Sequence, residues 1–406
     1  MNGTSDLTAD QLLAIEESWG ARNYHPLPIV IAHAQGAWVT DVNGRRYLDC
    51  LSAYSALNQG HVHPTILKAF QEQAARVTLT SRAFHNDQLP LLCRELAERC
   101  QSDTVLPMNT GAEAVETAIK AARRWGYEKK GIAADAAEIV VCRGNFHGRT
   151  TTIVGFSSDA EYQRDFGPFT PGFVQVPFGD IEAMRAAIRQ ETCAVLIEPI
   201  QCEAGIIMPP DGYLRDVADL CRANDVLFLA DEIQTGLGRT GAWFACDHEQ
   251  VRPDVYILGK ALSGGFYPVS AVVGRADVMG VFTPGSHGST YGGSPLASAV
   301  ARAALRVLDE EKLVERSATL GRALMKALAS LRGGVVVEVR GRGLLVGIEL
   351  DRPARPYCEQ LMAHGVLCKE THERVIRLAP PLVIAAADLH WMVEQLSAVL
   401  SPGTRH

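Results

Sequence analysis

A lysine at the end of an apolar stretch is the residue best placed to do covalent chemistry in this sequence. Val255 to Leu258 reads as a buried strand that stops at Gly259 and delivers Lys260 to its carboxyl end. Ligands of open α/β sheets bind at that end of the strands, where burial disfavours the charged form of a lysine. A neutral amine is the nucleophile that forms a Schiff base with an aldehyde. Most lysines are instead solvated, so Lys260 needs a chemical partner before it predicts a site.

An aspartate at the end of a second apolar run supplies that partner. The run begins at Val226 and ends in Asp231 and Glu232. A carboxylate at one strand end can hold a pyridinium nitrogen protonated, while an amine at another strand end forms the imine. The alternative is a structural ion pair between Asp231 and Lys260.

A third segment has the features of an anion site at the start of a helix. Thr110 and Glu113 have the spacing of a capping box, and Gly111 allows backbone N–H groups to approach a ligand closely. Taken alone, the segment is better explained as ordinary helix capping. Together with Lys260 and Asp231, it completes the set of groups that pyridoxal phosphate requires.

Strands and helix-length segments alternate through the middle of the chain. Strands are expected at 138–142, 194–198, 226–232 and 255–258, and a helix is expected at 212–223. This alternation predicts a parallel, doubly wound α/β sheet. A chain of 406 residues exceeds the usual single core, so two domains are expected.

The flanking regions predict smaller elements around this sheet. Asn43-Gly44 predicts a hairpin between 37–41 and 46–49. Periodic apolar residues predict helices at 7–18, 65–76, 295–311, 313–331, 356–364 and 387–400, and strands at 335–339 and 344–348. The expected organisation is an N-terminal segment, 1–50, that packs with the smaller domain, a large cofactor-binding domain, 51–294, and a small C-terminal domain, 295–406.

Composition excludes several classes of protein. The net charge of −7 argues against a nucleic-acid-binding protein, and no apolar run has the length of a membrane span. The first ten residues resemble neither a secretory nor a transit signal. The ten cysteines are scattered without a Cys-x-x-Cys pair, as is typical of reduced thiols in a cytoplasmic protein.

Two further motifs have ordinary explanations. His61 and His63 suggest a metal site, but no acidic or cysteine ligand lies beside them at metal spacing, so a loop before the helix at 65–76 is expected. The glycines at 341 and 343 suggest dinucleotide binding, but Gly343 leads into a strand, which favours a tight turn.

On these residues the chain resembles the class III aminotransferases, a family of fold-type I pyridoxal-phosphate enzymes. The likeness extends from about residue 23 to about residue 383. The motifs that carry it most clearly are Asn23–Pro28, Ser52–Ala56, Thr80–His85, Pro107–Glu113, Asp231–Gly236, Gly259–Gly265 and His287–Gly293. The family fold has a large domain with a doubly wound, mostly parallel sheet and a smaller α/β C-terminal domain. The motifs around Tyr24 and Tyr54 favour the branch that acts on ornithine over those that act on acetylornithine or 4-aminobutyrate.

The resemblance implies a set of contacts to the cofactor pyridoxal 5'-phosphate. Lys260 corresponds to the Schiff-base lysine that also moves the proton, and Asp231 to the partner of the pyridinium nitrogen. The other implied contacts are Gly111 and Ala112 at the phosphate, Phe146 stacked on the ring, Gln234 at the 3-hydroxyl, and Ser289 and Thr290 reaching the phosphate from a second subunit. The last two imply a homodimer.

The resemblance also implies the substrates and their contacts. Arg149 and Tyr24 correspond to the group that holds the α-carboxylate and α-amine of L-ornithine, and Tyr54 belongs to the same pocket. Glu203 and Arg377 correspond to a pair that masks one carboxylate site for the diamine and opens it for 2-oxoglutarate. The implied reaction transfers the δ-amino group of ornithine to 2-oxoglutarate. Its products are glutamate and glutamate 5-semialdehyde, which cyclises to pyrroline-5-carboxylate.

Three positions depart from the family pattern. Cys202 stands where many relatives have glycine, and it would strain the backbone beside Glu203 if that position needs a positive φ. Ser294 replaces a common asparagine, and His147 stands where some relatives have tryptophan. The alternatives to the ornithine reaction are another ω-aminotransferase, a decarboxylase or aminomutase on the same fold, and a non-catalytic interaction protein.

Overall fold

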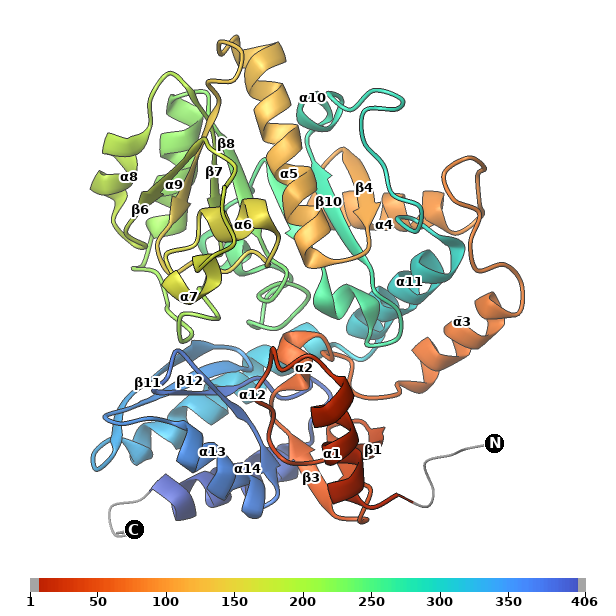
Figure 1. Cartoon of the computed structure of the whole chain (residues 1–406), viewed down its shortest axis with the longest axis vertical. Coiled ribbons are helices and arrows are strands. Elements are labelled where there is room, and N and C mark those ends of the chain that lie inside the picture. The colour runs from red at the N-terminus through yellow and green to blue at the C-terminus, as the bar shows by residue number, and fades with distance from the viewer. Residues whose placement is uncertain (1–6, 401–406) are drawn as a thin grey trace.

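The computed structural model describes residues 7–400 and is organised around a seven-stranded sheet (Figure 1). The strands lie in the order β4, β10, β9, β8, β7, β5, β6. Their bounds are Thr104–Met108 (β4), Glu138–Cys142 (β5), Phe173–Val176 (β6), Thr192–Ile197 (β7), Leu227–Asp231 (β8), Val255–Leu258 (β9) and Ser270–Gly274 (β10). Neighbouring strands are parallel, except that β10 runs antiparallel to β4 and β9. The fold is therefore the expected doubly wound, mostly parallel α/β fold.

Helices cover both faces of this sheet. Ile139 and Val141 of β5 pack in one apolar cluster with α5 (Gly111–Trp125), whereas Val140 and Cys142 pack in another with α8 (Ile181–Ala187) and α9 (Tyr213–Ala223). Successive side chains of a strand point to opposite faces, so β5 is buried on both sides. This double burial explains why the strands read as continuous apolar runs.

Most predicted elements lie close to their expected bounds. Strand β9 has the predicted bounds, α5 carries the predicted capping box between Thr110 and Glu113, and β2 and β3 form the predicted hairpin. Strand β10 was not predicted, because it has only three apolar residues in a row, between Ser270 and Gly274. The connection from β9 to β10 contains a short 3-10 helix, Lys260–Ser263, but no crossover α-helix, which explains their antiparallel pairing.

Two four-stranded sheets lie below the large sheet in Figure 1. The first contains β1 (Ile31–Gln35), β2 (Trp38–Asp41), β3 (Arg46–Asp49) and β13 (Val366–Leu367), in that order. It joins distant parts of the chain, because Leu48 of β3 pairs with Val366 of β13. The second contains β11 (Val336–Arg342), β12 (Leu345–Leu350), β15 (Val375–Leu378) and β14 (Lys369–Thr371), in that order.

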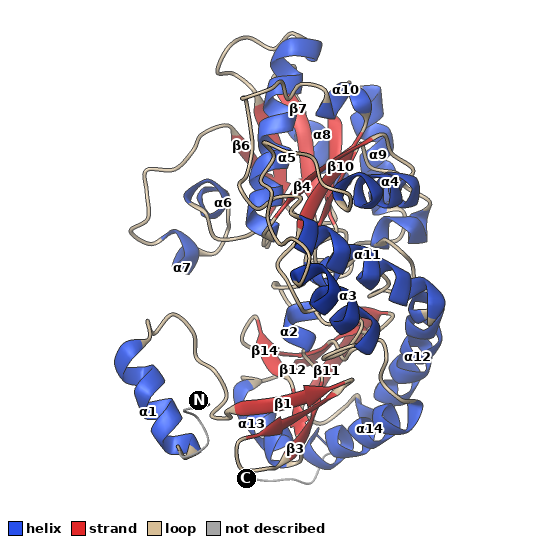
Figure 2. Ribbon diagram, turned by 90° about the vertical axis from the view of Figure 1, so that its right-hand side faces the viewer, coloured by secondary structure: helices blue, strands red, loops and turns tan. Residues whose placement is uncertain are grey.

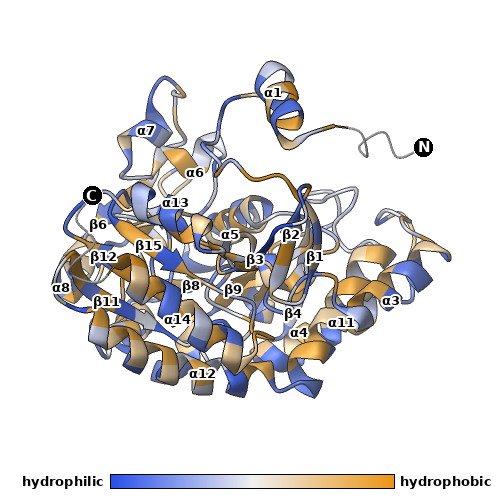
Figure 3. Cartoon of the chain, turned by 90° about the horizontal axis from the view of Figure 1, so that it is seen from below, coloured by the Kyte–Doolittle hydropathy of each residue, from blue (hydrophilic) through white to orange (hydrophobic). Residues whose placement is uncertain are grey.

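The remaining helices complete the two halves of the molecule. Their bounds are Ala9–Trp19 (α1), Ser52–Ser55 (α2), Pro64–Ala74 (α3), Leu89–Cys100 (α4), Thr151–Gly155 (α6), Ala160–Gln163 (α7), Ile181–Ala187 (α8), Tyr213–Ala223 (α9), Ala276–Met279 (α10), Pro295–Glu310 (α11), Leu313–Leu328 (α12), Arg355–Ala363 (α13) and Ala386–Leu400 (α14). Helix α1 stands away from the body in Figures 2 and 3, and none of its residues is buried. Of the helices within residues 7–400, none combines the length and apolar character needed to cross a bilayer.

The segment labelled α2 is a left-handed turn. Ser52, Ala53, Tyr54 and Ser55 have φ angles of 51°, 47°, 61° and 69°. For residues other than glycine, this conformation costs roughly 1–2 kcal/mol per residue. The sequence predicted only an ordinary loop here, because no glycine or asparagine marks the turn.

Candidate functional site

A cavity of about 190 Å³ lies at the carboxyl ends of the parallel strands, beside the start of α5. Both residues predicted to do chemistry reach it, Asp231 from the end of β8 and Lys260 from just after β9. The residues that line it are Gly111, Ala112, Phe146, His147, Gly148, Glu198, Ile200, Asp231, Ile233, Gln234, Thr235 and Lys260. The structure thus brings together six of the predicted cofactor residues.

Lys260 begins a short 3-10 helix, Lys260–Ser263, and has a φ of 41°. Desolvation lowers the pKa of Lys260 to about 8, and the nearby charge of Arg377 acts in the same direction, while Glu203 and Asp231 oppose the shift. A larger fraction of Lys260 is therefore neutral near pH 7 than for an exposed lysine. The neutral amine is the form that attacks a carbonyl carbon.

Asp231 is held in place by two contacts. Its Oδ1 accepts a hydrogen bond from the N–H of Ile233 at 3.1 Å, and its Oδ2 lies 2.7 Å from Nδ1 of His147. Both side chains are buried, and within the described residues Nε2 of His147 has no partner. Asp231 therefore keeps its orientation at the cavity wall through His147, a role that the sequence did not indicate.

The start of α5 offers unused donors to the cavity. The capping box uses the N–H groups of Thr110 and Glu113, whereas those of Gly111 and Ala112 donate to no group in the part of the chain described. A Cβ at Gly111 would lie 3.0 Å from Cδ1 of Ile233. A side chain there would crowd Ile233 at the cavity wall, so glycine keeps these donors accessible.

These residues fit pyridoxal phosphate. A partly neutral amine faces the cavity, an oriented carboxylate lies at its wall, and a helix start with free N–H donors suits a phosphate. Phe146, from the loop after β5, supplies an apolar ring at the same cavity.

Glu198 was missed by the sequence reading. It follows β7, lines the cavity, is buried, and accepts a hydrogen bond from the N–H of Phe146 at 2.8 Å. Desolvation, reinforced by the charge of Asp231, raises the pKa of Glu198 well above its ordinary value. Only its position at a strand end, like that of Asp231, could have indicated it.

A bidentate ion pair joins Glu203 to Arg377. The Nη1–Oε1 distance is 2.9 Å and the Nη2–Oε2 distance is 2.8 Å. Gln234 donates from Nε2 to Oε1 of Glu203 at 3.3 Å, and the guanidinium of Arg377 lies 5.4 Å from the ring centre of Tyr54. Burial alone would raise the pKa of Glu203, but the charge and hydrogen bonds of Arg377 lower it below its ordinary value. The predicted pair is therefore formed and ionised.

Cys202 causes no strain of the predicted kind. Near Glu203, the residues with positive φ are Gly205 and Ile206, and Cys202 is not among them. The carbonyl of Cys202 accepts a hydrogen bond from Nη2 of Arg377 at 2.9 Å. The expectation of strain at Cys202 was wrong, because this backbone position does not require left-handed geometry.

Arg149 and Tyr24 lie in different surroundings. Arg149 stacks over the rings of Tyr162 and Phe146, with its guanidinium 4.3 and 5.6 Å from the ring centres. Tyr24 is 66% exposed and lines an apolar cavity of about 420 Å³ together with Tyr54. Tyr162, which covers Arg149, was not singled out in the sequence.

Ser289 and Thr290 do not line the cavity of their own chain. Ser289 Oγ accepts hydrogen bonds from Nδ2 of Asn109 at 2.8 Å and from the N–H of Gly292 at 3.0 Å, and Thr290 is exposed. Ser294 caps α11 by accepting from the N–H of Ala297 at 3.3 Å.

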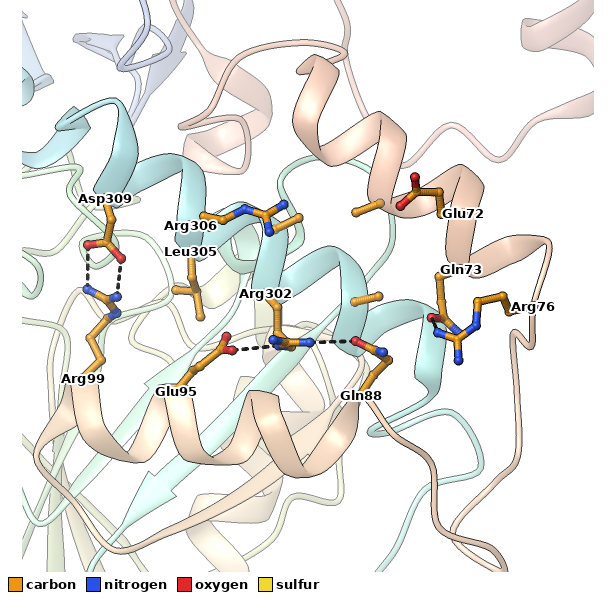
Figure 4. Close-up of a pocket in the computed structure, with 13 residues that line it drawn as sticks. Glu72, Gln73, Arg76, Gln88, Glu95, Arg99, Arg302, Leu305, Arg306 and Asp309 are labelled. Carbon is orange, nitrogen blue, oxygen red and sulfur yellow. Dashed lines mark hydrogen bonds and ion pairs between the residues drawn. The ribbon is translucent and has the colours of Figure 1, made fainter.

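The other charged clusters that could bind a ligand already contain ion pairs. A larger cavity of about 440 Å³ lies between α3, α4 and α11 (Figure 4), but its Arg99 is paired with Asp309 and its Arg302 with Glu95. His61 lies 2.7 Å from a carboxylate oxygen of Asp49, and His63 lies 2.8 Å from one of Glu311. Among the residues described, no group of three or more metal-ligating side chains is found.

Comparison with known proteins identifies a family. The class III aminotransferase family matches residues 19–400. An ornithine aminotransferase from Halalkalibacterium halodurans is 59% identical over 386 residues, which cover 95% of this chain and 97% of that protein. The structure of an ornithine aminotransferase from Toxoplasma gondii is similar with a TM-score of 0.96 and 44% identity, covering 97% of this chain and 95% of that one. An acetylornithine aminotransferase from Elizabethkingia anophelis is similar with a TM-score of 0.89 and 45% identity, covering 97% and 99%. The family match covers nearly the whole chain, and the cavity has a carboxylate and an amine at adjacent strand ends beside a helix start suited to phosphate. This chain therefore belongs to the class III aminotransferases, which depend on pyridoxal phosphate.

Proposed function

We propose that this chain is an ornithine δ-aminotransferase. It transfers the δ-amino group of L-ornithine to 2-oxoglutarate and forms glutamate 5-semialdehyde, which cyclises to pyrroline-5-carboxylate, and glutamate. The observation that carries the proposal is the Glu203–Arg377 pair beside Tyr54, because a diamine and a dicarboxylate must use one site in turn. The 59% identity to an ornithine aminotransferase supports it.

Lys260 is the catalytic amine. The cofactor, when bound, supplies an aldehyde that accepts amines and a ring that withdraws electrons from the reacting carbon. Lys260 Nζ would hold the cofactor in the absence of substrate, and as a free amine it would move the proton at the reacting carbon of the substrate. Its depressed pKa suits this work near neutral pH.

The remaining cofactor residues would position the cofactor and polarise its ring. Asp231, oriented by His147, would keep the ring nitrogen of the cofactor protonated, and Gln234 would bind its 3-hydroxyl. Phe146, held by the buried Glu198, would pack against the ring. Gly111 and Ala112 would bind the phosphate through their unused N–H groups.

The Glu203–Arg377 pair selects which end of each substrate reacts. An unpaired Arg377 would attract the α-carboxylate of ornithine and bring the α-amine to Lys260. Glu203 neutralises this attraction while ornithine is bound, so the δ-amine reacts. A carboxylate of 2-oxoglutarate then displaces Glu203 from Arg377 and forms the same fork of hydrogen bonds.

Arg149, Tyr24 and Tyr54 hold the far end of ornithine. Arg149 provides a cation for the α-carboxylate, and its stacking on Tyr162 limits its motion. Tyr24 and Tyr54 line one cavity, and Tyr54 lies 5.4 Å from the guanidinium of Arg377, which supports a role for both at the far end of the substrate.

The working form is a homodimer in the cytoplasm. Ser289 and Thr290 lie outside the cavity of their own chain, which supports a role at the phosphate of a second subunit. The ten free cysteines suit a reducing compartment. We assign 1–50 and 295–406 to the smaller unit and 51–294 to the large domain, and the reaction to arginine and proline metabolism.

The main competing function is another ω-aminotransferase, because the similar acetylornithine enzyme has 45% identity and the same fold. The deciding experiment gives the purified holoenzyme a panel of ornithine, N-acetylornithine and 4-aminobutyrate with 2-oxoglutarate, and identifies products by mass spectrometry. Pyrroline-5-carboxylate as the main product is expected. A higher kcat/KM for either competing donor would replace the proposal, and turnover without 2-oxoglutarate would indicate a decarboxylase or aminomutase.

A further inference from the structure

We infer that Asp49 and His61 form a clamp that positions Tyr54 and so sets the preference for ornithine. Neither residue lines the cofactor cavity, but both line the cavity that Tyr24 and Tyr54 share, and neither was assigned a role above. The inference rests on the proposed function, because it concerns how the same chain recognises the far end of ornithine.

The clamp acts on the left-handed turn of α2. Oδ1 of Asp49 accepts hydrogen bonds from the N–H groups of Leu51 and Ser52, both at 2.9 Å. Its Oδ2 lies 2.7 Å from Nε2 of His61. A carboxylate only accepts, so the imidazole donates to it. All three bonds end on one buried carboxylate at the entry to the turn.

His61 is itself fixed to the sheet. Its backbone N–H and carbonyl exchange hydrogen bonds with Gly36, at 2.8 and 3.0 Å. Asp49 is the last residue of β3, and its N–H donates to the carbonyl of Ala37 at 2.9 Å. The clamp therefore anchors both ends of segment 49–61 to the sheet that contains β1, β2 and β3.

The residue types in the turn between these anchors have no preference for left-handed backbone. Four consecutive residues other than glycine hold positive φ, and such strain persists only where the surroundings enforce it. Its effect is to direct the ring of Tyr54 toward Arg377, 5.4 Å away, and into the cavity shared with Tyr24. If this segment relaxed to right-handed backbone, the ring of Tyr54 would point away from Arg377.

The chain contains a matched control for this clamp. Asp41 is as buried as Asp49, at 8% exposure. One of its oxygens accepts from the N–H groups of Asn43 and Arg45, both at 2.9 Å, and the other from the hydroxyl of Tyr47 at 3.1 Å. Its turn joins β2 to β3 and does not contain a substrate residue.

The experiment compares Asp49→Ala and Asp41→Ala holoenzymes, with kcat and KM for ornithine and for N-acetylornithine. Both variants should lose thermal stability. Only Asp49→Ala should lower kcat/KM for ornithine by about tenfold, a difference of ~1.4 kcal/mol, mainly through a higher KM. N-Acetylornithine should be affected much less, so the ornithine preference falls.

Variants at Ala53, which is exposed, test the turn without removing the clamp. Ala53→Gly tolerates positive φ and should partly restore the ornithine preference when combined with Asp49→Ala. Ala53→Pro fixes φ at about −65° and should lower the preference by itself.

Equal losses for both donors, or the same change in preference in Asp41→Ala, would overturn the clamp. So would an unchanged preference in a folded Ala53→Pro protein. A wild-type enzyme that does not prefer ornithine would instead contradict the proposed function, so the two failures are distinguishable.

Discussion

The carboxylate of Glu203 and the guanidinium of Arg377 face each other as a two-pronged pair, with nitrogen–oxygen distances of 2.9 and 2.8 Å. Arg377 is 1% exposed. Removing Glu203 would therefore leave a buried cation without its main counter-charge. The unpaired guanidinium of Arg377 would attract the carboxylate of any substrate that binds beside it.

Glu203→Ala should damage the two half-reactions unequally. Reaction at the δ-amine of ornithine should slow, whereas glutamate, which reacts through its α-amine, should become a better donor. An unpaired charged partner changes free energies by ~1–3 kcal/mol, so shifts of about tenfold or more are expected. Single-turnover absorbance changes of the cofactor with each donor measure this. If Glu203→Ala changes the single-turnover rates with both donors by the same factor, Glu203 is only one partner of a structural ion pair.

Cofactor loading should follow the protonation of Lys260. The neutral amine reacts, and its pKa is lowered to about 8 from 10.5. The rate at which cofactor-free protein binds pyridoxal phosphate covalently should therefore rise with pH and level off above about 8. Stopped-flow absorbance at several pH values gives the curve, with Lys260→Ala as the control that shows no covalent phase. A rate still rising steeply at pH 10 would contradict the depressed pKa.

Glu198→Gln should change the pH dependence of stability. The folded state raises the pKa of Glu198 above its ordinary value of 4.5, so it binds the proton more tightly than the unfolded chain. The stabilisation that comes from tighter proton binding at Glu198 is fully present below pH 4.5 and is lost as the pH rises through the folded-state pKa. Glutamine does not titrate and retains an oxygen that can accept from the N–H of Phe146. The Tm of the cofactor-free variant, relative to wild type, should increase between pH 5 and pH 8; a constant difference would exclude this account.

Mixed dimers test the role of Thr290. Thr290→Ala should weaken cofactor binding, and Lys260→Ala should abolish turnover. If Thr290 completes the site of the second subunit, hybrid dimers carry both defects in one site and neither in the other. Mixing the two preparations under subunit exchange, at a cofactor concentration that leaves Thr290→Ala poorly loaded, should therefore restore part of the activity. A fully active monomer in sedimentation experiments would count against the shared site.

The sequence predicted those parts of the site that depend on local pattern. Lys260 and Asp231 lie at strand ends marked by apolar runs, and the capping box at Thr110 is visible from spacing alone. The missed contacts join residues far apart in the chain. His147 and Asp231 are separated by 84 positions, and Phe146 and Glu198 by 52. Such contacts depend on the order of strands in the sheet, which no local pattern encodes.

Resemblance supplied the pairing of Glu203 with Arg377, which residue types alone would not have indicated. Neither the residue types nor the resemblance indicated the left-handed turn at Tyr54. Ser, Ala, Tyr and Ser have no preference for left-handed backbone, so we attribute it to the hydrogen bonds from Leu51 and Ser52 to Asp49, whose carboxylate is held by His61. Likewise, β10 has only three apolar residues in a row, between Ser270 and Gly274, which is too short a run to mark a strand.

The pairing of Leu48 in β3 with Val366 in β13 has a consequence for biosynthesis. All strands of the large sheet lie between residues 104 and 274, so that sheet can close while the ribosome is still making the rest of the chain. The hairpin of β2 and β3 emerges first, but its edge must wait for β13 near the end of synthesis. Until then β3 exposes an unpaired strand edge, which favours association with other chains. Ribosome-bound nascent chains stalled before β13 should therefore bind chaperones more strongly than chains that extend past it.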